Sequence, residues 1–493
     1  EKFTRLFLWR RHPGEAWATY GYDCVTFGDV CAGMALEIAK SKGADLGREI
    51  HENTAEQLKK KVYVDDAALA ARNKEELEKM KGQQKEDGTY DGYISQILAK
   101  SGMAPKYIAI AGEAGAGEEE HIGGAFLGVG YSCRTDQISF TFPPTYKKKG
   151  RGGAKVEVSM SAREVASLRL GKGSFTTRKA LSYIMGQYDP MGLTSPISMR
   201  GKLLLRQSHV AATGWDADLP EDIQKRWGDL VTELAEVGTV FFPRSTVPEG
   251  VQEEERPIIL GFGDGSTDGF AAIVYTVWLD NEGGSKVLPM MAKARIAPLS
   301  GTTVPRMEMS SAALLARLGF LVLRSAGFTA EEVVLALDSE CSVAAIRKQD
   351  GLLRPFFSHR AAEINDAMKE MRKYCNKVSP VVAVAGQDNP ADVATRDLAS
   401  VVDISPTSPW QCGPKFAQLP RETWPLRERV CEETIPVEEL RVHMVSCNLA
   451  AILEQTPRLV KEVLLEAPLA GGPARPFPDH ATCRGLLAAA LEL

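Results

Sequence analysis

The chain has 493 residues, more than one ordinary domain holds, and its 44% hydrophobic and 25% charged residues are typical of a globular protein. A net charge of −5 argues against a protein that coats nucleic acid by charge alone. The nine cysteines are scattered without a CxxC pair, which argues against a disulfide framework and a zinc module. No apolar run predicts a membrane span. The chain begins at Glu1 without a leader, so we expect the middle of a longer, intracellular chain.

The first half of the chain divides into two predicted segments. Residues 1–142 alternate strand and helix patterns: strands at 6–10 and 61–64, helices at 31–40 and 73–81, and a hairpin from 126–131 and 137–142. Prolines and glycines near 143–153 mark a boundary, and residues 143–256 are predicted to be mostly helical. A basic run at this boundary is predicted to be a loop, either a solvated surface or a contact to nucleic acid; it contains Lys147, Lys148, Lys149 and Arg151.

Residues 257–405 have a different pattern. Strands are predicted at 257–264, 269–279, 287–297, 333–338 and 378–385, and helices at 305–326, 339–348, 359–374 and 390–399. This order predicts an α/β fold with a mixed five-stranded sheet and flanking helices. Residues 406–493 are expected to be a linker and tail.

Four acidic residues stand at the ends of these predicted elements. Asp264 and Asp338 end strands, Glu308 lies in the first turn of the long helix on its inward stripe, and Asp392 follows Asn389-Pro390, which can cap and start a helix. Taken singly, each acid is better explained by a surface or capping role. Together they would repel one another unless a cation offset the charge, and carboxylates without histidine or thiolate select Mg²⁺ or Mn²⁺. The set therefore predicts a two-metal site for phosphodiester cleavage.

The sequences around these acids resemble the motifs of the ribonuclease H family. They read Gly263-Asp264-Gly265-Ser266, Met307-Glu308-Met309, Leu337-Asp338-Ser339 and Asn389-Pro390-Ala391-Asp392. The wider chain resembles the Pol polyprotein of Pao/BEL-class LTR retrotransposons, through Asp189-Pro190-Met191-Gly192-Leu193 and 292–298 among other segments. This resemblance implies cleavage of the RNA strand in RNA–DNA hybrids, with magnesium as cofactor and manganese as an alternative.

The N-terminal segment resembles part of a reverse transcriptase palm. Val25-Thr26-Phe27-Gly28 resembles polymerase motif B, and Tyr63-Val64-Asp65-Asp66 is the YVDD motif of the class. By this resemblance Asp65 and Asp66 would hold polymerase metals, while Tyr63, Phe27 and Gly28 would contact nucleic acid. The palm aspartate that precedes motif B and the fingers would lie before Glu1, so we expect no DNA synthesis by this chain alone.

Two departures from the family pattern affect the expected activity. Ala32-Gly33 stands where the family usually has Ser-Pro, and Ala383 stands where it commonly has a loop histidine that is thought to assist product release or proton transfer. The replacement at Ala383 bears on the rate of RNA cleavage but leaves the four carboxylates intact. His359 is nearby in sequence, yet a lone histidine on a helix is more often structural or exposed.

Three functions remain open at this stage. The leading hypothesis is a ribonuclease that cleaves the RNA strand of RNA–DNA hybrids. Its expected partners are nucleic acid and the other Pol segments, namely the fingers and the integrase that serves DNA integration. Its expected location is the cytoplasm, a virus-like particle or the nucleus. The second is a catalytically decayed remnant that only binds nucleic acid. The third is an aspartic peptidase, because Pao elements carry such a peptidase and this region of the polyprotein is often given the name of that peptidase family. A peptidase needs Asp-Thr-Gly or Asp-Ser-Gly loops, and no clear copy is found.

Overall fold

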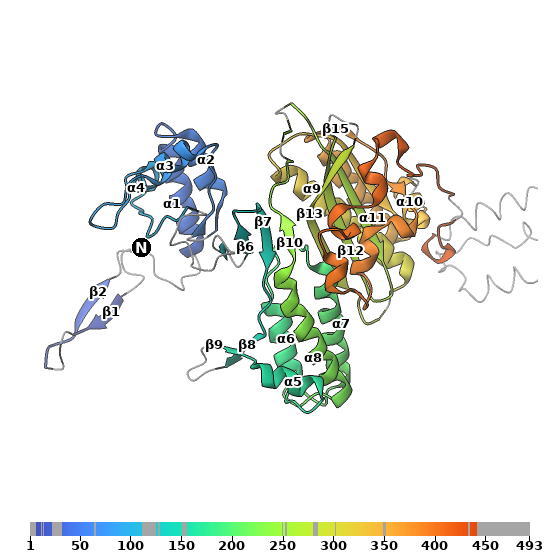
Figure 1. The fold of residues 1–493 in the computed structure, drawn as a ribbon, viewed down its shortest axis with the longest axis horizontal. Coiled ribbons are helices and arrows are strands. Elements are labelled where there is room, and N and C mark those ends of the chain that lie inside the picture. The colour runs from blue at the N-terminus through green and yellow to red at the C-terminus, as the bar shows by residue number, and fades with distance from the viewer. Residues whose placement is uncertain are drawn as a thin grey trace, which may run out of the picture.

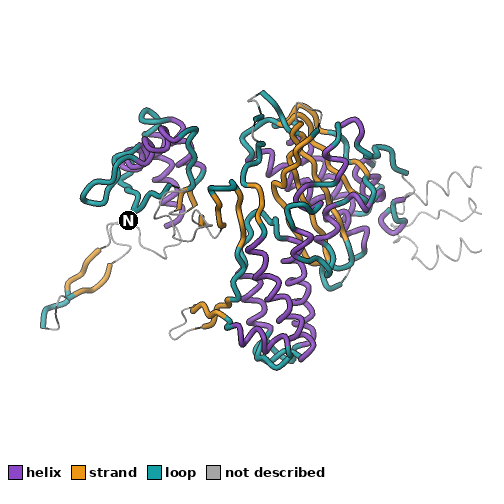
Figure 2. The backbone as a smooth tube through the Cα atoms, in the orientation of Figure 1, coloured by secondary structure: helices purple, strands orange, loops and turns teal. Residues whose placement is uncertain are grey.

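The structure is a computed structural model that describes most of the chain up to Leu440. The described residues are 6–10, 12, 14–21, 32–63, 66–110, 125–126, 129–149, 155–248, 250–251, 254–279, 284–300, 302–348, 352–431 and 434–440. Figures 1 and 2 show a large sheet with helices on both faces and a bundle of helices below it in the view. Within the described part of the chain, no helix is both long and apolar enough to cross a membrane.

The N-terminal elements are short. They are β1 (Leu6–Trp9), β2 (Ala18–Gly21), α1 (Ala32–Leu46), α2 (Glu52–Lys60), β3 (Val62–Tyr63), β4 (Asp66–Ala67), α3 (Lys74–Lys81) and α4 (Tyr93–Ala99). Ala55, Leu58 and Ile97 form a small core between α2 and α4. The expected hairpin is present as β6 (Val129–Ser132) and β7 (Gln137–Phe140), within a four-stranded sheet that also contains β5 (Ala125–Phe126) and β10 (Phe241–Pro243).

The basic run is not a loop where the structure describes it. Lys147, Lys148 and Lys149 lie in β8 (Thr145–Lys149), which pairs antiparallel with β9 (Lys155–Ser159). The sequence predicts a loop here because glycines and prolines surround the lysines, but the backbone of these lysines forms antiparallel ladder pairs instead. Arg151 lies outside the described residues.

Four helices form the bundle: α5 (Ala162–Arg169), α6 (Thr177–Gly186), α7 (Ser195–Ala211) and α8 (Glu221–Glu236). Helix α8 buries a stripe at helical spacing, with Ile223, Trp227, Leu230 and Leu234 all facing the core. The indole of Trp227 donates a 2.8 Å hydrogen bond to Ser208 Oγ on α7, so its one polar atom is satisfied in the interior.

The large sheet has the strand order β13-β12-β11-β14-β15, and β16 also pairs with β14. β11 (Ile258–Gly265), β12 (Gly269–Leu279) and β13 (Ser285–Ile296) are antiparallel, while β14 (Ala330–Leu337) runs parallel to β11. The expected fifth strand is divided into β15 (Cys375–Val378) and β16 (Val382–Ala383). The mixed α/β fold predicted from the sequence is confirmed.

Side chains alternate between the two faces of this sheet. Ile259 faces the core under α9 (Val304–Ser325), α10 (Glu340–Arg347) and α11 (Pro355–Met371), whereas Leu260 and Phe262 face the core shared with α7 and α8. The expected closing helix is shorter than predicted. It is the 3-10 helix η4 (Pro390–Ala394), which packs on β11 and β12.

The Asp189–Thr194 loop fastens the bundle to the sheet. Met191 accepts a 2.8 Å backbone hydrogen bond from Ala292 of β13, and Asp189 accepts hydrogen bonds from the backbone of Gly192, Leu193 and Thr194. Gly192 has a φ of +70°, and a Cβ there would lie 1.8 Å from the carbonyl oxygen of Ala292. Only glycine fits this close approach between loop and strand.

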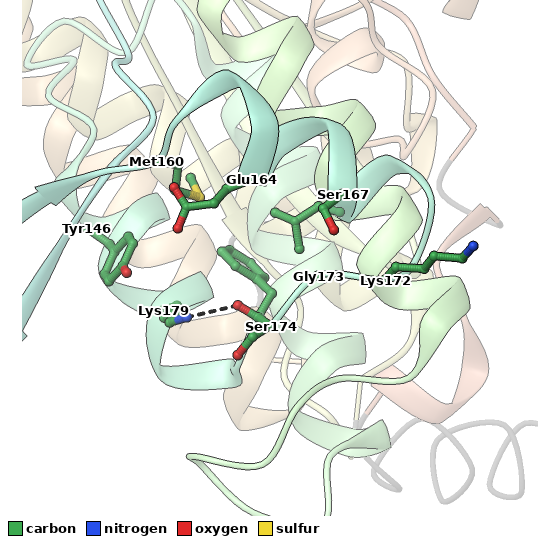
Figure 3. A pocket seen from close by; sticks show the side chains of 10 residues that line it. Tyr146, Met160, Glu164, Ser167, Lys172, Gly173, Ser174 and Lys179 are labelled. Carbon is green, nitrogen blue, oxygen red and sulfur yellow. Dashed lines mark hydrogen bonds between the residues drawn. The ribbon is translucent and has the colours of Figure 1, made fainter.

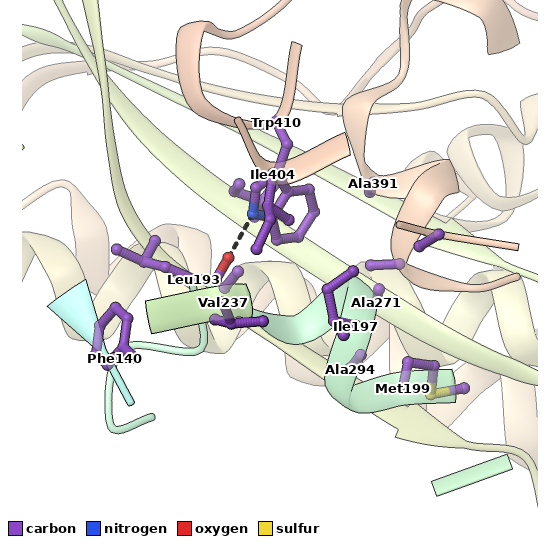
Figure 4. Packing of buried hydrophobic residues seen from close by; sticks show 14 of the residues in the cluster. Phe140, Leu193, Ile197, Met199, Val237, Ala271, Ala294, Ala391, Ile404 and Trp410 are labelled. Carbon is purple, nitrogen blue, oxygen red and sulfur yellow. Dashed lines mark hydrogen bonds between the residues drawn. The ribbon is translucent and has the colours of Figure 1, made fainter. Parts of the chain in front are cut away.

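Residues after 405 also enter the shared core. α12 (Pro409–Cys412) and the 3-10 helices η6 (Lys415–Gln418) and η7 (Arg421–Thr423) cover the sheet, and η9 (Val437–Glu439) follows. Trp410 is buried, and its indole donates a 2.7 Å hydrogen bond to the carbonyl of Leu193 in the bundle (Figure 4). Its own carbonyl accepts from the Tyr275 hydroxyl of β12 at 2.9 Å. Trp410 therefore joins the bundle, the sheet and the C-terminal segment.

Replacing Trp410 by alanine should lower the free energy of unfolding by about 3–5 kcal/mol, because a large cavity forms and the Leu193 carbonyl loses its donor. Urea unfolding followed by circular dichroism measures this. Leu398→Ala is the matched control, since Leu398 is 85% exposed and its loss should change stability by less than about 0.5 kcal/mol. Equal stability of the two variants would contradict a shared core.

Candidate active site

Three of the four predicted acids meet at one end of the large sheet. Asp264 lies near the end of β11, Asp338 directly follows β14, and Glu308 lies in the early part of α9. One carboxylate oxygen from each lies within 4.8 Å of the others. The structure therefore brings together acids that are separated by more than 70 residues between the first and the last.

Strand pairing places the two aspartates. β11 and β14 are parallel, and Gly263 pairs with Leu337, so Asp264 and Asp338 stand next to each other where their strands end. Gly265 admits the third acid, because a Cβ on Gly265 would lie 2.4 Å from the backbone nitrogen of Glu308. The close contact between β11 and α9 thus depends on this glycine, and it brings Glu308 to the aspartates.

Burial raises the pKa of all three carboxyls, and the charges of neighbouring acids add to this shift. Burial raises the pKa of Glu308 to about 9, and the charges of Asp338 and Asp264 add to this. The pKa of Asp264 rises to about 6, chiefly by burial, although the Thr395 hydroxyl donates a hydrogen bond that lowers it. Burial also raises the pKa of Asp338. The folded protein therefore disfavours three negative charges here unless a cation is bound.

Two oxygens of the cluster have no hydrogen-bond partner. Glu308 Oε2 and Asp338 Oδ1 are buried, and neither contacts a donor among the residues that the structure describes. Buried polar atoms are normally satisfied, so unpaired carboxylate oxygens in a cluster of three acids fit a bound cation. All the donors are oxygens, which suits Mg²⁺ or Mn²⁺.

Asp392 lies beside this cluster but is held by another partner. It is on η4, capped by Asn389 and begun by Pro390 as the sequence predicted. Arg396 binds its Oδ1 through Nε at 2.8 Å and Nη2 at 2.5 Å. The charge of Asp392 still contributes to the raised pKa of Asp264 and Asp338, so it is near them.

Sequence reasoning missed the residues that orient these acids. Asn389 donates a 3.0 Å hydrogen bond to the carbonyl of Gly263, which ties η4 to β11, and its hydrogen bond lowers the pKa of Asp338. Thr395 and Arg396 contact Asp264 and Asp392. The only sequence signal for Arg396 was its position four residues after Asp392, the spacing of a helical ion pair.

The position expected for a histidine lies inside the sheet. Ala383 is fully buried in β16 and pairs with Leu337, one residue before Asp338. His359 is exposed on α11. Cys341 is half-buried, and burial followed by the charge of Glu308 raises the pKa of its thiol to about 11, so the thiol stays protonated.

The predicted polymerase residues are only partly described. Asp66 is exposed on β4, where it pairs with Tyr63 of β3. Asp65, Phe27 and Gly28 lie outside the described residues. The roles of these residues in metal and nucleic-acid binding remain predictions.

A separate cavity of about 220 Å³ lies between β8, α5 and α6 (Figure 3). Its Lys179 lies 5.5 Å from the centre of the Tyr146 ring and donates a 2.8 Å hydrogen bond to the Ser174 carbonyl. None of the four acids lines this cavity. The acids at the end of the sheet are therefore the better candidate for catalysis.

Strand order and acid placement together define a ribonuclease H-like domain. Residues 176–339 match the family described as the Pao retrotransposon-like RNaseH-like domain. The match runs from the start of α6 to just past Asp338, so it spans most of the bundle and three of the acids. This confirms the retrotransposon resemblance.

Solved structures give weaker likenesses. The N-terminal RNase H domain of Rv2228c from Mycobacterium tuberculosis is 14% identical over 29% of this chain and 93% of its own, with a TM-score of 0.21. LC11-RNase H1 in complex with an RNA/DNA hybrid is 17% identical over 28% and 91%, with a TM-score of 0.20. The foamy viral protease-reverse transcriptase in complex with dsDNA is 10% identical over 48% and 44%, with a TM-score of 0.17.

No curated protein sequence matches the chain significantly. The identities and TM-scores of these solved structures do not enter the assignment of a ribonuclease H-like domain. That assignment rests on the strand order of the chain itself and on the family match.

Glu308 should make the stability of the metal-free protein fall as pH rises. Its pKa is raised from 4.5 to about 9 in the folded state, so the folded protein holds a proton that the unfolded chain releases. The stability from this proton is complete below the unfolded pKa and is lost as pH rises through the folded pKa. Urea unfolding in chelator between about pH 5 and pH 9 should show the wild-type free energy of unfolding falling relative to Glu308→Gln.

Asp366→Asn, which changes an exposed acid on α11 away from the cluster, is the matched control. Manganese should stabilise the wild type more at the higher pH, because the cation replaces the proton. Parallel pH profiles for wild type and Glu308→Gln would contradict the raised pKa.

Proposed function

We propose that residues 257–405 are a metal-dependent ribonuclease that hydrolyses the RNA strand of RNA–DNA hybrids within a retrotransposon Pol polyprotein. The observation that carries this proposal is the buried group of Asp264, Glu308 and Asp338 with two unpaired oxygens. A structural role would leave repelling carboxylates uncompensated in the interior. A cation site accounts for both their proximity and their missing donors.

The three acids would hold Mg²⁺ or Mn²⁺, and Asp392 would join them when Arg396 releases its carboxylate. Divalent ions at such a site lower the pKa of water and stabilise the leaving oxygen during phosphodiester hydrolysis. The chain itself orients the ligands. Thr395 fixes one oxygen of Asp264, and Asn389 acts on Asp338 while it ties η4 to β11.

The substrate class is proposed from the match to a retrotransposon RNaseH-like family. An RNA–DNA hybrid is recognised by groove shape and 2′-hydroxyls rather than by sequence, which needs no strongly basic protein. The solved LC11-RNase H1 complex holds such a hybrid. The β8 lysines, of which Lys147 is exposed, are candidate phosphate contacts.

The remaining segments are assigned on the same resemblance. Residues 1–142 would be a partial reverse transcriptase palm with Asp65 and Asp66 as its metal ligands. Residues 143–256 would be the thumb and connecting region, and 406–493 would lead toward the rest of the polyprotein. The experiment below tests the ribonuclease alone.

Asp338→Asn should abolish cleavage of a labelled RNA–DNA hybrid in Mg²⁺ or Mn²⁺. Losing a ligand removes several kcal/mol of transition-state stabilisation, which corresponds to a rate loss on the order of a thousandfold. Asp366→Asn is the matched control and should cleave at the wild-type rate, because Asp366 is exposed on α11. Initial rates measured on denaturing gels give the comparison.

A wild-type protein that binds the hybrid but leaves it intact in both metals would refute the ribonuclease and favour the decayed, binding-only alternative. Calorimetry with Mn²⁺ would then show whether the carboxylates still bind a cation. An aspartic peptidase would instead cleave a polypeptide without metal, and Asp338→Asn would leave that activity unchanged.

A further inference from the structure

The last described segment of the chain wraps the elements that carry two of the acids. We call residues 427–440 the C-terminal strap; 432–433 are outside the described residues. At its start, Arg427 forms a β-bridge with Ala383 and an ion pair of 2.5 Å with Glu340, two residues after Asp338. At its end, Glu439 forms an ion pair of 2.6 Å with Arg306, two residues before Glu308. In the middle, Ile435 is buried in the core under α10 and α11.

Glu439 is an unusual residue for the end of a surface segment. Its side chain is 2% exposed, and its Oε2 has no hydrogen-bond partner among the described residues. Its backbone is also fixed, because its carbonyl accepts a 2.8 Å hydrogen bond from Arg354 and Leu440 bridges Leu353. A buried carboxylate is costly unless a cation compensates it, so the position of Glu439 is coupled to that of Arg306.

Arg306 lies in the first turn of α9, which its own N-cap residue does not secure. Thr303 makes no side-chain hydrogen bond to the helix start. The first backbone N–H groups of a helix lack partners within the helix, so an uncapped first turn is free to fray. The Arg306 guanidinium lies 5.3 Å from the centre of the Phe356 ring on α11, and its Nε donates to Glu439. These two contacts hold the first turn from outside.

We propose that Glu439 is a positioning residue for Glu308, acting through Arg306 on the first turn of α9. The inference rests on the proposed ribonuclease function. Arg306 and Glu308 are two residues apart, and the Arg306 carbonyl accepts a 2.7 Å hydrogen bond from Ser310 Oγ in the next turn. A shift at Arg306 therefore moves the helix start as a unit. The strap would then be part of the catalytic unit rather than a linker.

The test is Glu439→Gln in the full chain, with Glu438→Gln as the matched control. Glu438 is the adjacent residue and is exposed, whereas Glu439 is buried. Glu439→Gln should lower kcat for the hybrid about tenfold to a hundredfold with KM unchanged, since a small misplacement of a catalytic group has effects of that size. It should also weaken Mn²⁺ binding measured by calorimetry without nucleic acid. Glu438→Gln should match the wild type in both.

A double-mutant cycle separates positioning from general stability. In the Glu308→Gln background, Glu439→Gln should cause no further loss of Mn²⁺ affinity, because the residue that it positions is already removed. Arg306→Gln should reproduce the Glu439→Gln effects from the other side of the ion pair. Circular dichroism confirms that each variant is folded at the assay temperature.

The outcomes are distinct. Loss of thermal stability with wild-type kcat and Mn²⁺ affinity overturns the inference and leaves Glu439 a structural residue. Additive losses in the Glu308→Gln background also overturn it. A wild-type chain that neither cleaves the hybrid nor binds Mn²⁺ refutes the proposed function itself, and the inference falls with it. Active wild type beside an indistinguishable Glu439→Gln refutes the positioning role alone.

Discussion

Repulsion among three buried carboxylates is the constraint on which the site depends. At a separation of about 4 Å and an effective dielectric of 20, each pair of charges costs about 4 kcal/mol. Burial is the main cause of the raised pKa of Asp264, Glu308 and Asp338, and the charges of neighbouring acids add to it. Such a cluster persists because the surrounding packing enforces it. The charge is then compensated by protons in the free protein and, under the proposed function, by cations.

The packing that enforces the cluster comes from distant parts of the chain. Gly265 lets α9 approach β11, and Asn389 ties η4 to the same strand. The C-terminal strap holds the start of α9 from a third direction through Arg306. Each contact acts on an element that carries an acid, so the geometry of the site reflects the whole domain rather than a local motif.

The helical bundle belongs to the same physical unit as the sheet. Its core is continuous with one face of the sheet, and Gly192 and Trp410 connect the two. The family match begins at the bundle, at residue 176, and not at the first strand of the sheet. Both findings indicate that the bundle and the ribonuclease H-like sheet form together, because each covers apolar surface that the other would expose.

The sequence alone determined the order of strands and helices along the chain, the long helix α9 and the position of each acid near the end of an element, because apolar patterns are local properties of the chain. It misjudged the strand that contains Lys147, which was predicted to be a loop, and the length of η4. Only the tertiary structure decided that Arg396 holds Asp392, that Ala383 is buried, and that Glu439 reaches Arg306. The burial of Ala383 and the contact between Glu439 and Arg306 arise from packing, so no local pattern records them, whereas the i,i+4 spacing of Asp392 and Arg396 is a local signal.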